Sequence, residues 1–444
     1  MPLRLCLKNS PLIMLASLLI GVPGARATAA DAAPRPNVLF ISIDDMNNRL
    51  GCYGFDAVPT PNLDRLAARG VKFERAYCNY PVCNVSRTSF LSGRRPETKF
   101  QPDEVTWLPE HFAANGYFTA EVGKVAHSYG VTRETIQWDL SEYDAKWPGR
   151  ETEEEKHVDG RRTMRAIQLM EERREKPFFL AVGFQKPHSP FKATPKYHAM
   201  YPAEKIALLE EPAEHLKEIP SVAFLNSTTE AQRNRTPDER RELTADYYAC
   251  HAFIDAQVGL LLDAVDRLGI ADRTIIVFFS DHGLHLGEHG GMWGKRSLFE
   301  ESMRIPLIVA APGKRQGTRS PRLVELVDLY PTLADLCGLP APPQHEGTSF
   351  AALLAEPERS WKAGAFGNVT RPDGQSGRTV RTERYRYIEW GGPETAQLYD
   401  LEQDPHEHRN LVGRSERAET LAMMRQLLED GWSAAAPKQR ASRN

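Results

Sequence analysis

Four continuous apolar segments constrain the fold of this chain more than any other feature. Each is seven or eight residues long and rich in branched or aromatic side chains, as in strands that are buried on both faces of a sheet. Helical patterns separate them: one over residues 61–69, capped by Thr60 and ended by Gly70, and a longer one from the capping box at Thr236 to about Leu268. Buried strands that alternate with helices predict an α/β fold with a large, mostly parallel sheet flanked by helices. The predicted strands are residues 37–43, 177–184, 274–280 and 305–311.

The N-terminus has the pattern of a secretory signal peptide. Arg4 and Lys8 precede an apolar run that ends near the small residues around Ala27. This run is shorter than the roughly 20 apolar residues that a membrane anchor needs. We therefore expect a signal peptide over residues 1–27, cleaved near Ala27, and a secreted or periplasmic protein that is not attached to the membrane.

The rest of the chain is longer than one ordinary hydrophobic core requires, so we expect a large domain and a smaller one. The large domain is predicted over residues 28–360. A proline-rich loop at 340–343 and short strand patterns after it predict a C-terminal α+β subdomain over 361–433. Residues 434–444 have no apolar periodicity, which predicts a disordered tail. The formal net charge of −3 and the absence of a long basic run give no indication of a nucleic-acid partner.

The cysteine count leaves at least one thiol outside any intrachain disulfide. Removal of the signal peptide removes Cys6 and leaves five cysteines, an odd number. Their wide, irregular spacing argues against a disulfide scaffold and against a zinc finger. Four of them are expected to be small buried hydrophobic residues, the common fate of an isolated cysteine. These are Cys52, Cys78, Cys250 and Cys337.

Cys83 has a more distinctive setting. It precedes a short helical pattern that ends at Gly93, and Arg87 follows one turn later. A thiol near a helix N-terminus and an arginine lies in a positive field that favours its ionised or oxidised forms. The alternative, that Cys83 is one more buried hydrophobic residue, is the commoner outcome for a cysteine taken alone.

Two acidic clusters follow predicted strands. Asp44 and Asp45 end the first strand, and Asp281 and His282 end the strand over 274–280. Ligands of open α/β sheets bind beyond the carboxyl ends of the strands, so both clusters could face one site. Three converging carboxylates would repel one another without a cation, and oxygen ligands suit Ca²⁺ or Mg²⁺. Either cluster alone would more often be a helix cap or a turn, but the two together favour a metal site.

Three further segments supply lysines and histidines. Each lies in or beside a loop, from which its side chains could reach a pocket. Taken singly, each is more often a solvated lysine or a hydrogen-bonded histidine. Together with an acidic metal site, they suggest an anion held between the metal and the lysines, as displacement at a sulfuryl or phosphoryl centre requires. The segments are Gly123–His127, Lys186–His188 and Trp293–Lys295.

At this point the chain resembles the type I sulfatases of the alkaline phosphatase superfamily, and within them the iduronate-2-sulfatase-like branch. The resemblance covers nearly the whole mature chain and implies an alkaline phosphatase-like α/β fold. Several long motifs occur in the family's order. They are NVLFISIDDM, LGCYG, TPNLDRLAARGVKFERAY, CNVSRTSFLSGRRP, GKVAH, QKPHSP, FFSDHGLHLGEHGGMWGK, VELVDLYPTLADLCGL and LYDLEQDPHEHRNL.

The resemblance implies a chemical role for Cys83 and a metal. Sulfatases of this type convert the cysteine of a Cys-x-Pro-x-Arg signal into formylglycine, and Cys83 is the matching residue. One hydroxyl of the hydrated aldehyde attacks sulfur, and the other then loses its proton so that sulfate is released. Asp44, Asp45, Asp281 and His282 match the calcium ligands, together with the modified Cys83. Calcium is implied rather than magnesium.

The resemblance also assigns the cationic residues. Arg87 and Lys124 match the residues that stabilise the ionised hydroxyl. His127 matches the histidine that takes the second proton during elimination. His188 and Lys295 match the pair that holds the sulfate and assists the leaving oxygen.

The implied partners are a sulfated carbohydrate and a formylglycine-generating or equivalent maturation enzyme. The chain departs from the pattern of the family at Val85, where the signal has proline, and at Ala126, where the branch has an aromatic residue. Two other functions stay open: a phosphonate or phosphate ester hydrolase of the same superfamily, and a non-catalytic glycan-binding protein that lacks formylglycine. Candidate platforms for stacking on sugar rings are Trp138, Trp147, Trp293 and Trp390.

Overall fold

The computed structural model describes residues 35–127, 135–144, 151–224, 230–340, 344–371 and 374–437. The chain from Arg35 onward forms one compact unit. The predicted signal peptide, most of the predicted tail and Trp147 lie outside the described residues. No helix in the described ranges is long and apolar enough to cross a membrane. The five cysteines that follow the predicted signal peptide are all free thiols.

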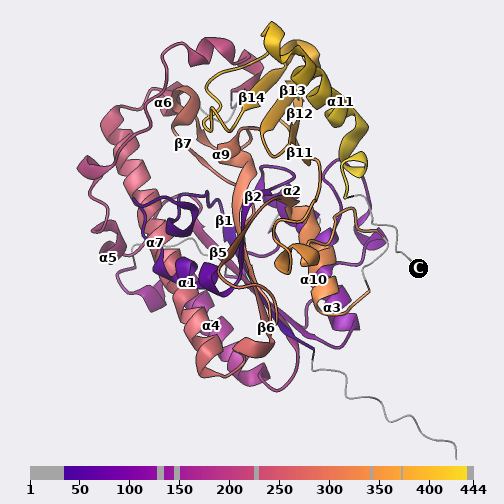
Figure 1. Cartoon of the computed structure of the whole chain (residues 1–444). Coiled ribbons are helices and arrows are strands. Elements are labelled where there is room, and N and C mark those ends of the chain that lie inside the picture. The colour runs from indigo at the N-terminus through magenta and orange to yellow at the C-terminus, as the bar shows by residue number, and fades with distance from the viewer. Residues whose placement is uncertain are drawn as a thin grey trace, which may run out of the picture. The chain divides into compact units, whose positions relative to one another are not determined.

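An eight-stranded sheet forms the centre of the unit, as the apolar segments predict (Figure 1). Seven strands point the same way, and β9 runs antiparallel to both of its neighbours, β2 and β6. The apolar run that predicts β9 is correct, but a run buried on both faces carries no information on strand direction. In sheet order the strands are β10 (Thr318–Glu325), β2 (Val71–Tyr77), β9 (Arg304–Ala310), β6 (Thr274–Ser280), β1 (Asn37–Asp44), β5 (Phe178–Pro187), β3 (Phe118–Gly123) and β4 (Leu140–Glu142).

Helices cover both faces of this sheet (Figure 1). The side chains of β1 alternate between two hydrophobic layers, with Phe40 in one layer and Leu39 and Ile41 in the other. The predicted capping box at Thr236 is confirmed, since its hydroxyl accepts from the Glu239 N–H at the start of α7. The Phe40 layer contains α2 (Cys83–Ser92), α3 (Leu108–Ala114) and α10 (Leu329–Leu336), and the other contains α1 (Pro61–Arg69), α4 (Val158–Arg173) and α7 (Pro237–Arg267).

Helix α1 has the predicted bounds, with Thr60 at the N-cap and Gly70 at the C-cap, but the two capping residues do not have the expected geometry. The Thr60 hydroxyl does not cap the helix and instead accepts from the Gly51 N–H at 2.9 Å. Gly70 adopts an extended conformation rather than a left-handed one. A Cβ atom at Gly70 would lie 2.3 Å from the Val309 carbonyl oxygen, so glycine is required by the close approach of β9.

A smaller antiparallel sheet and one helix follow the large sheet, in agreement with the predicted α+β character of this region. Helix α11 packs against the sheet through Met424 and Leu428, which contact a small core of their own that includes Leu398. The sheet consists of β11 (Ala365–Thr370), β12 (Ser376–Arg381), β13 (Tyr385–Trp390) and β14 (Gln397–Asp400), and α11 spans Ala418–Ala434. The short elements are α5 (Pro195–His198), α6 (Glu230–Arg233), β7 (His285–Leu286), α8 (Glu288–Gly291), β8 (Trp293–Gly294) and α9 (Glu300–Met303).

Candidate active site

Three carboxylates meet at the carboxyl ends of two neighbouring strands. Asp44 is the last residue of β1, and Asp281 follows β6 directly. The Asp281 N–H donates to the Ile43 carbonyl oxygen at 3.0 Å, which fixes the two strand ends side by side. Asp45 turns out of the strand with a positive φ of 69°, and its N–H donates to Asp281 Oδ1 at 3.1 Å. All three side chains are buried.

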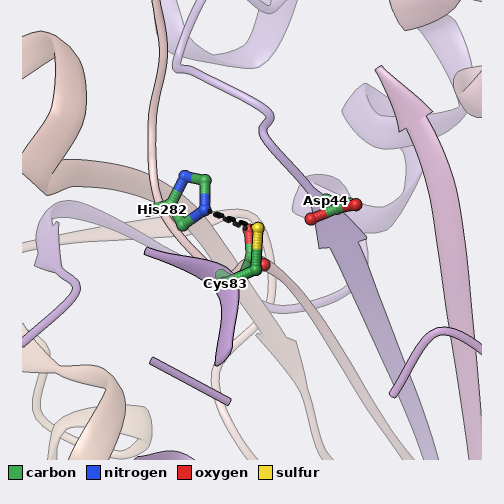
Figure 2. A group of neighbouring side chains, drawn as sticks. Asp44, Cys83 and His282 are labelled. Carbon is green, nitrogen blue, oxygen red and sulfur yellow. Dashed lines mark hydrogen bonds and ion pairs between the residues drawn. The ribbon is translucent and has the colours of Figure 1, made fainter. Parts of the chain in front are cut away.

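Cys83 lies beside this group as the first residue of α2, and its side chain is buried. Its Sγ atom lies 3.2 Å from His282 Nε2 (Figure 2). The same sulfur lies 3.1 Å from Lys295 Nζ and 3.8 Å from Asp45 Oδ1. The structure therefore brings the residue with the most distinctive setting in the sequence to the centre of the acidic cluster.

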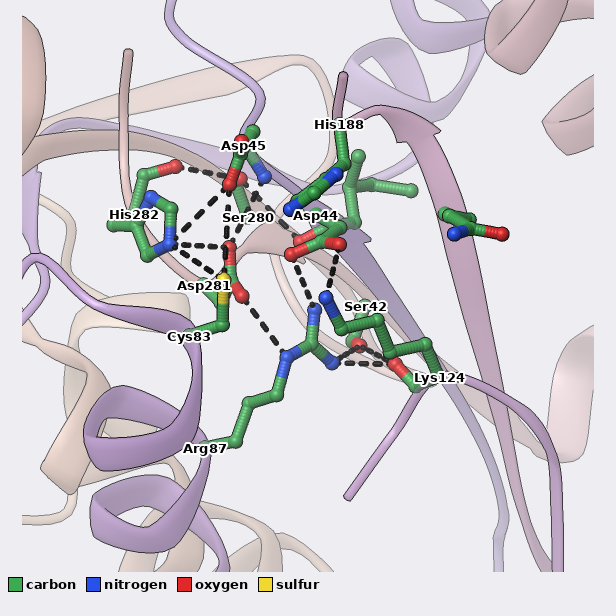
Figure 3. Close-up of polar contacts among 12 residues, drawn as sticks. Ser42, Asp44, Asp45, Cys83, Arg87, Lys124, His188, Ser280, Asp281 and His282 are labelled. Atoms are coloured by element: carbon green, nitrogen blue, oxygen red, sulfur yellow. Dashed lines mark hydrogen bonds and ion pairs between the residues drawn. The ribbon is translucent and has the colours of Figure 1, made fainter. Parts of the chain in front are cut away.

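Each carboxylate has a cationic partner, and Figure 3 shows those of Asp44 and Asp281. Arg87 is fully buried, donates to Asp281 Oδ2 at 2.9 Å, and lies 3.4 Å from Asp44 Oδ1. Lys124 Nζ lies 2.5 Å from Asp44 Oδ2, and Lys295 Nζ lies 2.5 Å from Asp45 Oδ1. The three positive side chains thus come from α2, from the residue after β3 and from the residue after β8.

The cationic partners keep Asp44 and Asp45 ionised. Burial alone would raise the pKa of Asp44, but Lys124, followed by His188 and Arg87, holds it well below the usual value. Burial opposes ionisation of Asp45 in the same way, and Lys295 nevertheless lowers its pKa to about 2. In Lys295 itself, Asp45 overcomes burial and raises the pKa. Asp44 and Asp45 are therefore charged at neutral pH.

The expectation that the unmodified thiol of Cys83 is readily ionised is wrong. Burial, followed by the charge of Asp44, raises the pKa of Cys83, and the nearby Lys295 compensates only in part. Arg87 interacts with Cys83, but its guanidinium also pairs with Asp281 and Asp44 and does not prevent the rise. As a thiol, Cys83 is therefore neutral and a weak nucleophile.

His282 is placed to act as a neutral ligand. Burial lowers its pKa, although Asp281 acts in the opposite direction. Its Nδ1 lies 2.9 Å from the Gly283 carbonyl oxygen, which can only accept, so Nδ1 carries the proton and the Nε2 lone pair faces Cys83. Ligand atoms of Asp44, Cys83, Asp281 and His282 lie within 4.8 Å of one another. This donor set fits one cation.

A second overlapping group includes His188, which follows β5. One ligand atom each from His188, Asp44, Asp45 and Cys83 lies within 4.8 Å of the others. Lys186, from the same segment, does not reach the pocket, and its Nζ donates to the carbonyl oxygens of His188 at 2.5 Å and of Pro190 at 2.7 Å. Lys186 thus fixes the loop that carries His188.

His127 is half-buried three residues after Lys124, at the end of the described segment that follows β3. Its assigned role in proton transfer remains a prediction.

The structure adds two residues that sequence reasoning missed. Ser42 Oγ accepts from Arg87 Nη1 at 3.1 Å. The sequence contains a signal for Ser42, because a polar residue inside an apolar strand indicates a specific hydrogen-bond partner. Tyr247 donates from its hydroxyl to the Asp45 carbonyl oxygen at 2.7 Å and holds the turn after β1. Nothing in the pattern of α7 distinguishes Tyr247 from an ordinary core tyrosine.

A cavity of about 430 Å³ opens onto the cluster. Asp45, His188 and Lys295 form one wall, and Lys192 and Arg235 lie among its other lining residues. A larger cavity of about 1030 Å³ contains neither the three carboxylates nor Cys83. Of the candidate stacking residues, Trp293 lines the smaller cavity but is buried in the core, Trp390 is also buried, and Trp138 packs against the core.

Comparison with known proteins identifies the family. The sulfatase family profile matches residues 36–339, and the profile for the C-terminal region of N-sulphoglucosamine sulphohydrolase matches residues 287–433. A sulfatase of Formosa agariphila is 32% identical, with 85% of this chain and 83% of the relative covered. Iduronate 2-sulfatase of Homo sapiens is 30% identical, with 93% and 97% covered.

Solved structures show the same fold. The phosphonate monoester hydrolase of Agrobacterium radiobacter has a TM-score of 0.77 and 22% identity, over 89% of this chain and 95% of that protein. A protein solved with its substrate D-glucosamine-2-N,6-O-disulfate has a TM-score of 0.75 and 24% identity, over 92% and 100%. The family profile matches most of the chain, and the two relatives are at least 30% identical over at least 83% of their length. This protein therefore belongs to the sulfatase family, as a type I sulfatase of the alkaline phosphatase superfamily and a sulfuric ester hydrolase.

Proposed function

We propose that this protein removes sulfate from a sulfated carbohydrate, with Cys83, oxidised to formylglycine, as the nucleophile and calcium as the metal. The observation that carries the proposal is the position of Cys83 Sγ, between the imidazole of His282 and the ammonium group of Lys295 and beside Asp45. A nucleophile at this position would attack a sulfate group that is held between a cation and lysines.

The residues present fit a hard cation. Asp44, Asp45 and Asp281 offer buried carboxylate oxygens, and His282 offers a neutral nitrogen. Calcium accepts six to eight oxygen ligands in flexible geometry, whereas magnesium demands an octahedron and retains several waters. An oxygen-rich, buried donor set on two strand ends therefore favours calcium. When bound, the ion would withdraw electron density from the sulfate group.

The burial of Cys83 also bears on its modification. The side chain is 5% exposed at the start of α2, so a modifying enzyme could not reach it in the folded protein. Conversion to formylglycine must therefore precede folding. Formylglycine supplies, when hydrated, one hydroxyl that attacks sulfur and a second whose deprotonation releases sulfate.

The surrounding side chains have separate tasks in this proposal. Lys124 and Arg87 hold negative charge near the nucleophile, and Lys295 and His188 face the cavity where the sulfate would bind. His127 would take the proton during elimination. Water is excluded on the protein side because the carboxylates and Arg87 are fully buried.

The cavity suits a sugar that carries further negative charge. Arg235 lies 4.9 Å from the centroid of the Trp293 ring, and Lys192 lines the same cavity. Trp293 itself is buried, so the contact with the sugar would come from Arg235, which could meet a carboxylate or a second sulfate group. The named relatives, an iduronate 2-sulfatase and a protein solved with a disulfated glucosamine, act on or bind such sugars. A glycosaminoglycan is therefore the proposed substrate class, and export before substrate contact is the proposed role of residues 1–27.

The proposal is tested with protein produced alongside a maturation enzyme. The mass of the peptide that contains Cys83 reports the converted fraction, and release of sulfate from an aryl sulfate reports activity. Cys83→Ala should abolish release without unfolding the protein, whereas Cys78→Ala, at a buried cysteine in the preceding loop, should retain it. Activity that persists in Cys83→Ala would contradict the mechanism, and faster turnover of an aryl phosphonate than of the sulfate would contradict the substrate class.

A further inference from the structure

A second cluster of histidines and glutamates lies apart from the residues assigned to sulfate hydrolysis. Three imidazoles gather there, with ring centroids 5.8 Å apart for His215 and His289, 4.7 Å for His215 and His408, and 6.0 Å for His289 and His408. Glu211 lies among them. The four residues come from the loop before α6, from α8 and from the segment after β14, so the cluster joins three distant parts of the sequence.

His215 presents a free lone pair to this cluster. Its Nδ1 lies 2.7 Å from the Pro212 carbonyl oxygen, which requires a proton on Nδ1. Nε2 is then unprotonated, and it lies 3.8 Å from Glu211 Oε1. It makes no hydrogen bond with any residue that the structure describes, although the side chain is almost completely buried. In a metal-binding histidine, one ring nitrogen typically donates a hydrogen bond to a backbone carbonyl oxygen, and the other has a lone pair that is open to the metal. His215 has this arrangement.

His289 is completely buried, and its ring stacks on Phe299 with a centroid distance of 4.1 Å. Within the described ranges neither ring nitrogen makes a hydrogen bond, although Nε2 lies 3.5 Å from Glu301 Oε2. A buried polar atom without a hydrogen bond costs about 1–3 kcal/mol. Unsatisfied nitrogens on two neighbouring imidazoles therefore point to a missing ligand rather than to packing.

We propose that Glu211, His215 and His289 bind a zinc ion, with His408 as the fourth ligand. One ligand atom from each of the first three lies within 4.8 Å of the other two. His408 Nε2 lies 3.9 Å from Glu211 Oε1 and also makes no hydrogen bond in the described part of the chain. Small side-chain rotations would bring these atoms to the distances of about 2.0–2.2 Å that zinc requires.

The charge and orientation of the ligands fit this ion. Glu211 is held in place because its oxygens accept from the backbone N–H groups of His289 and, at 2.9 Å, of Gly290. Each oxygen keeps a further lone pair. Glu211 thus brings one negative charge beside the imidazoles of His215 and His408.

The two metal sites would select different ions. Three carboxylates surround Cys83, whereas the four proposed zinc ligands are three imidazoles and one carboxylate, with Glu301 and Glu407 as further carboxylates near His289. Oxygen ligands favour calcium, and imidazole ligands favour zinc. The zinc would also hold the hairpin of β7 and β8 in place, because its ligand His289 lies between these two strands. Lys295 follows β8 directly. The role of the zinc would be structural, holding the segment that presents Lys295.

The experiment measures the zinc content of the full-length protein, purified without a polyhistidine tag in buffer that contains calcium. One zinc ion per chain is expected by elemental mass spectrometry. His215→Gln and His289→Gln should reduce it at least tenfold. Cys83→Ser should retain the zinc, as should His198→Gln, which removes a histidine on α5 that pairs with Asp246 outside the cluster.

A second measurement does not depend on variants that could fail to fold. Wild-type protein, freed of zinc with a zinc-selective chelator while calcium is kept, should bind Co²⁺ and show the visible absorption of nitrogen-ligated tetrahedral cobalt. Added zinc should remove this absorption and raise Tm. Wild-type protein that binds neither zinc nor cobalt, or zinc that is lost in Cys83→Ser and retained in His215→Gln, would overturn the proposal.

Discussion

Replacement of Lys295 by methionine tests the electrostatic role of the site most directly. Methionine keeps much of the length and the apolar stem of the side chain but removes its charge. In the structure Lys295 Nζ lies 3.1 Å from Cys83 Sγ and 2.5 Å from Asp45 Oδ1. The substitution thus removes the positive charge nearest to the proposed nucleophile and to one carboxylate of the proposed metal site.

The size of the effect follows from these distances. We place one unit charge on Lys295 Nζ and one on the ionised nucleophile at the position of Cys83 Sγ, 3.1 Å away. Two such charges interact with about 5 kcal/mol at an effective dielectric constant of about 20. Water that enters the partly exposed position of Lys295 would return some of this energy. A net loss of about 3–4 kcal/mol remains, as for other single preorganised contacts, and corresponds to a decrease in kcat of about 10²- to 10³-fold. The pKa of Asp45 should also rise from about 2 when its main partner is removed.

The assay measures kcat and KM for an aryl sulfate at equal converted fraction of Cys83. Lys192→Met is the matched control, because Lys192 lines the same cavity but is not a contact of Cys83 or of the carboxylates in the proposed mechanism. It should retain kcat within about threefold. A Lys295→Met enzyme with a kcat near that of the wild type, or equal losses in both variants, would refute the assignment of Lys295 to the reacting centre.

Three further predictions concern metal, pH and maturation. Removal of calcium by a chelator should inactivate the enzyme and lower Tm by about a few degrees, because binding to the folded state alone stabilises it; an unchanged Tm with and without calcium would contradict the metal site. Glu325, paired at 2.9 Å with buried Arg95, has a pKa held below its usual value despite burial; its stabilisation is present above the unfolded-state pKa of about 4.3 and is lost as pH falls below it. Arg95→Met should therefore cost about 1.5–3 kcal/mol at neutral pH, because Lys362 stays paired with Glu325 at 2.7 Å, and should weaken the acid dependence of the free energy of unfolding measured in urea. Val85→Pro should raise the converted fraction of Cys83, with activity per converted molecule constant; equal conversion in both proteins would show that the proline is dispensable.

The strand ends of the site could be predicted because two simple signals coincide. The apolar runs stop abruptly at Asp44 and at Asp281, and parallel strands bring their carboxyl ends to one edge of a sheet. No long-range knowledge is needed for this step. The resemblance to sulfatases then supplies Arg87, Lys124 and Lys295, which the structure places on the carboxylates.

Other features depend on tertiary contacts that no local pattern contains. The antiparallel direction of β9 is one, because strand direction is set by the connections and not by the apolar run itself. The hydrogen bond from Tyr247 to Asp45 spans about half of the chain. Thr60 has the local signature of a helix cap, but its hydroxyl accepts from Gly51 instead, since the loop before α1 folds back onto it.

The setting of Cys83 in the sequence and its burial in the structure have opposite effects on its thiol. A helix start and a nearby arginine predict an activated thiol, yet burial makes the thiol of the folded protein neutral. In the proposed mechanism, the Cys83 side chain must therefore be converted to formylglycine before it is buried. Val85 is the third residue of α2. It precedes the first backbone hydrogen bond of the helix, which the Ser86 N–H donates to the Val82 carbonyl oxygen. A proline there removes an N–H that the helix does not use, so the folded enzyme has little reason to distinguish valine from proline. In the proposed mechanism, Val85 would therefore act on the unfolded chain that the maturation enzyme recognises, and not on the folded enzyme.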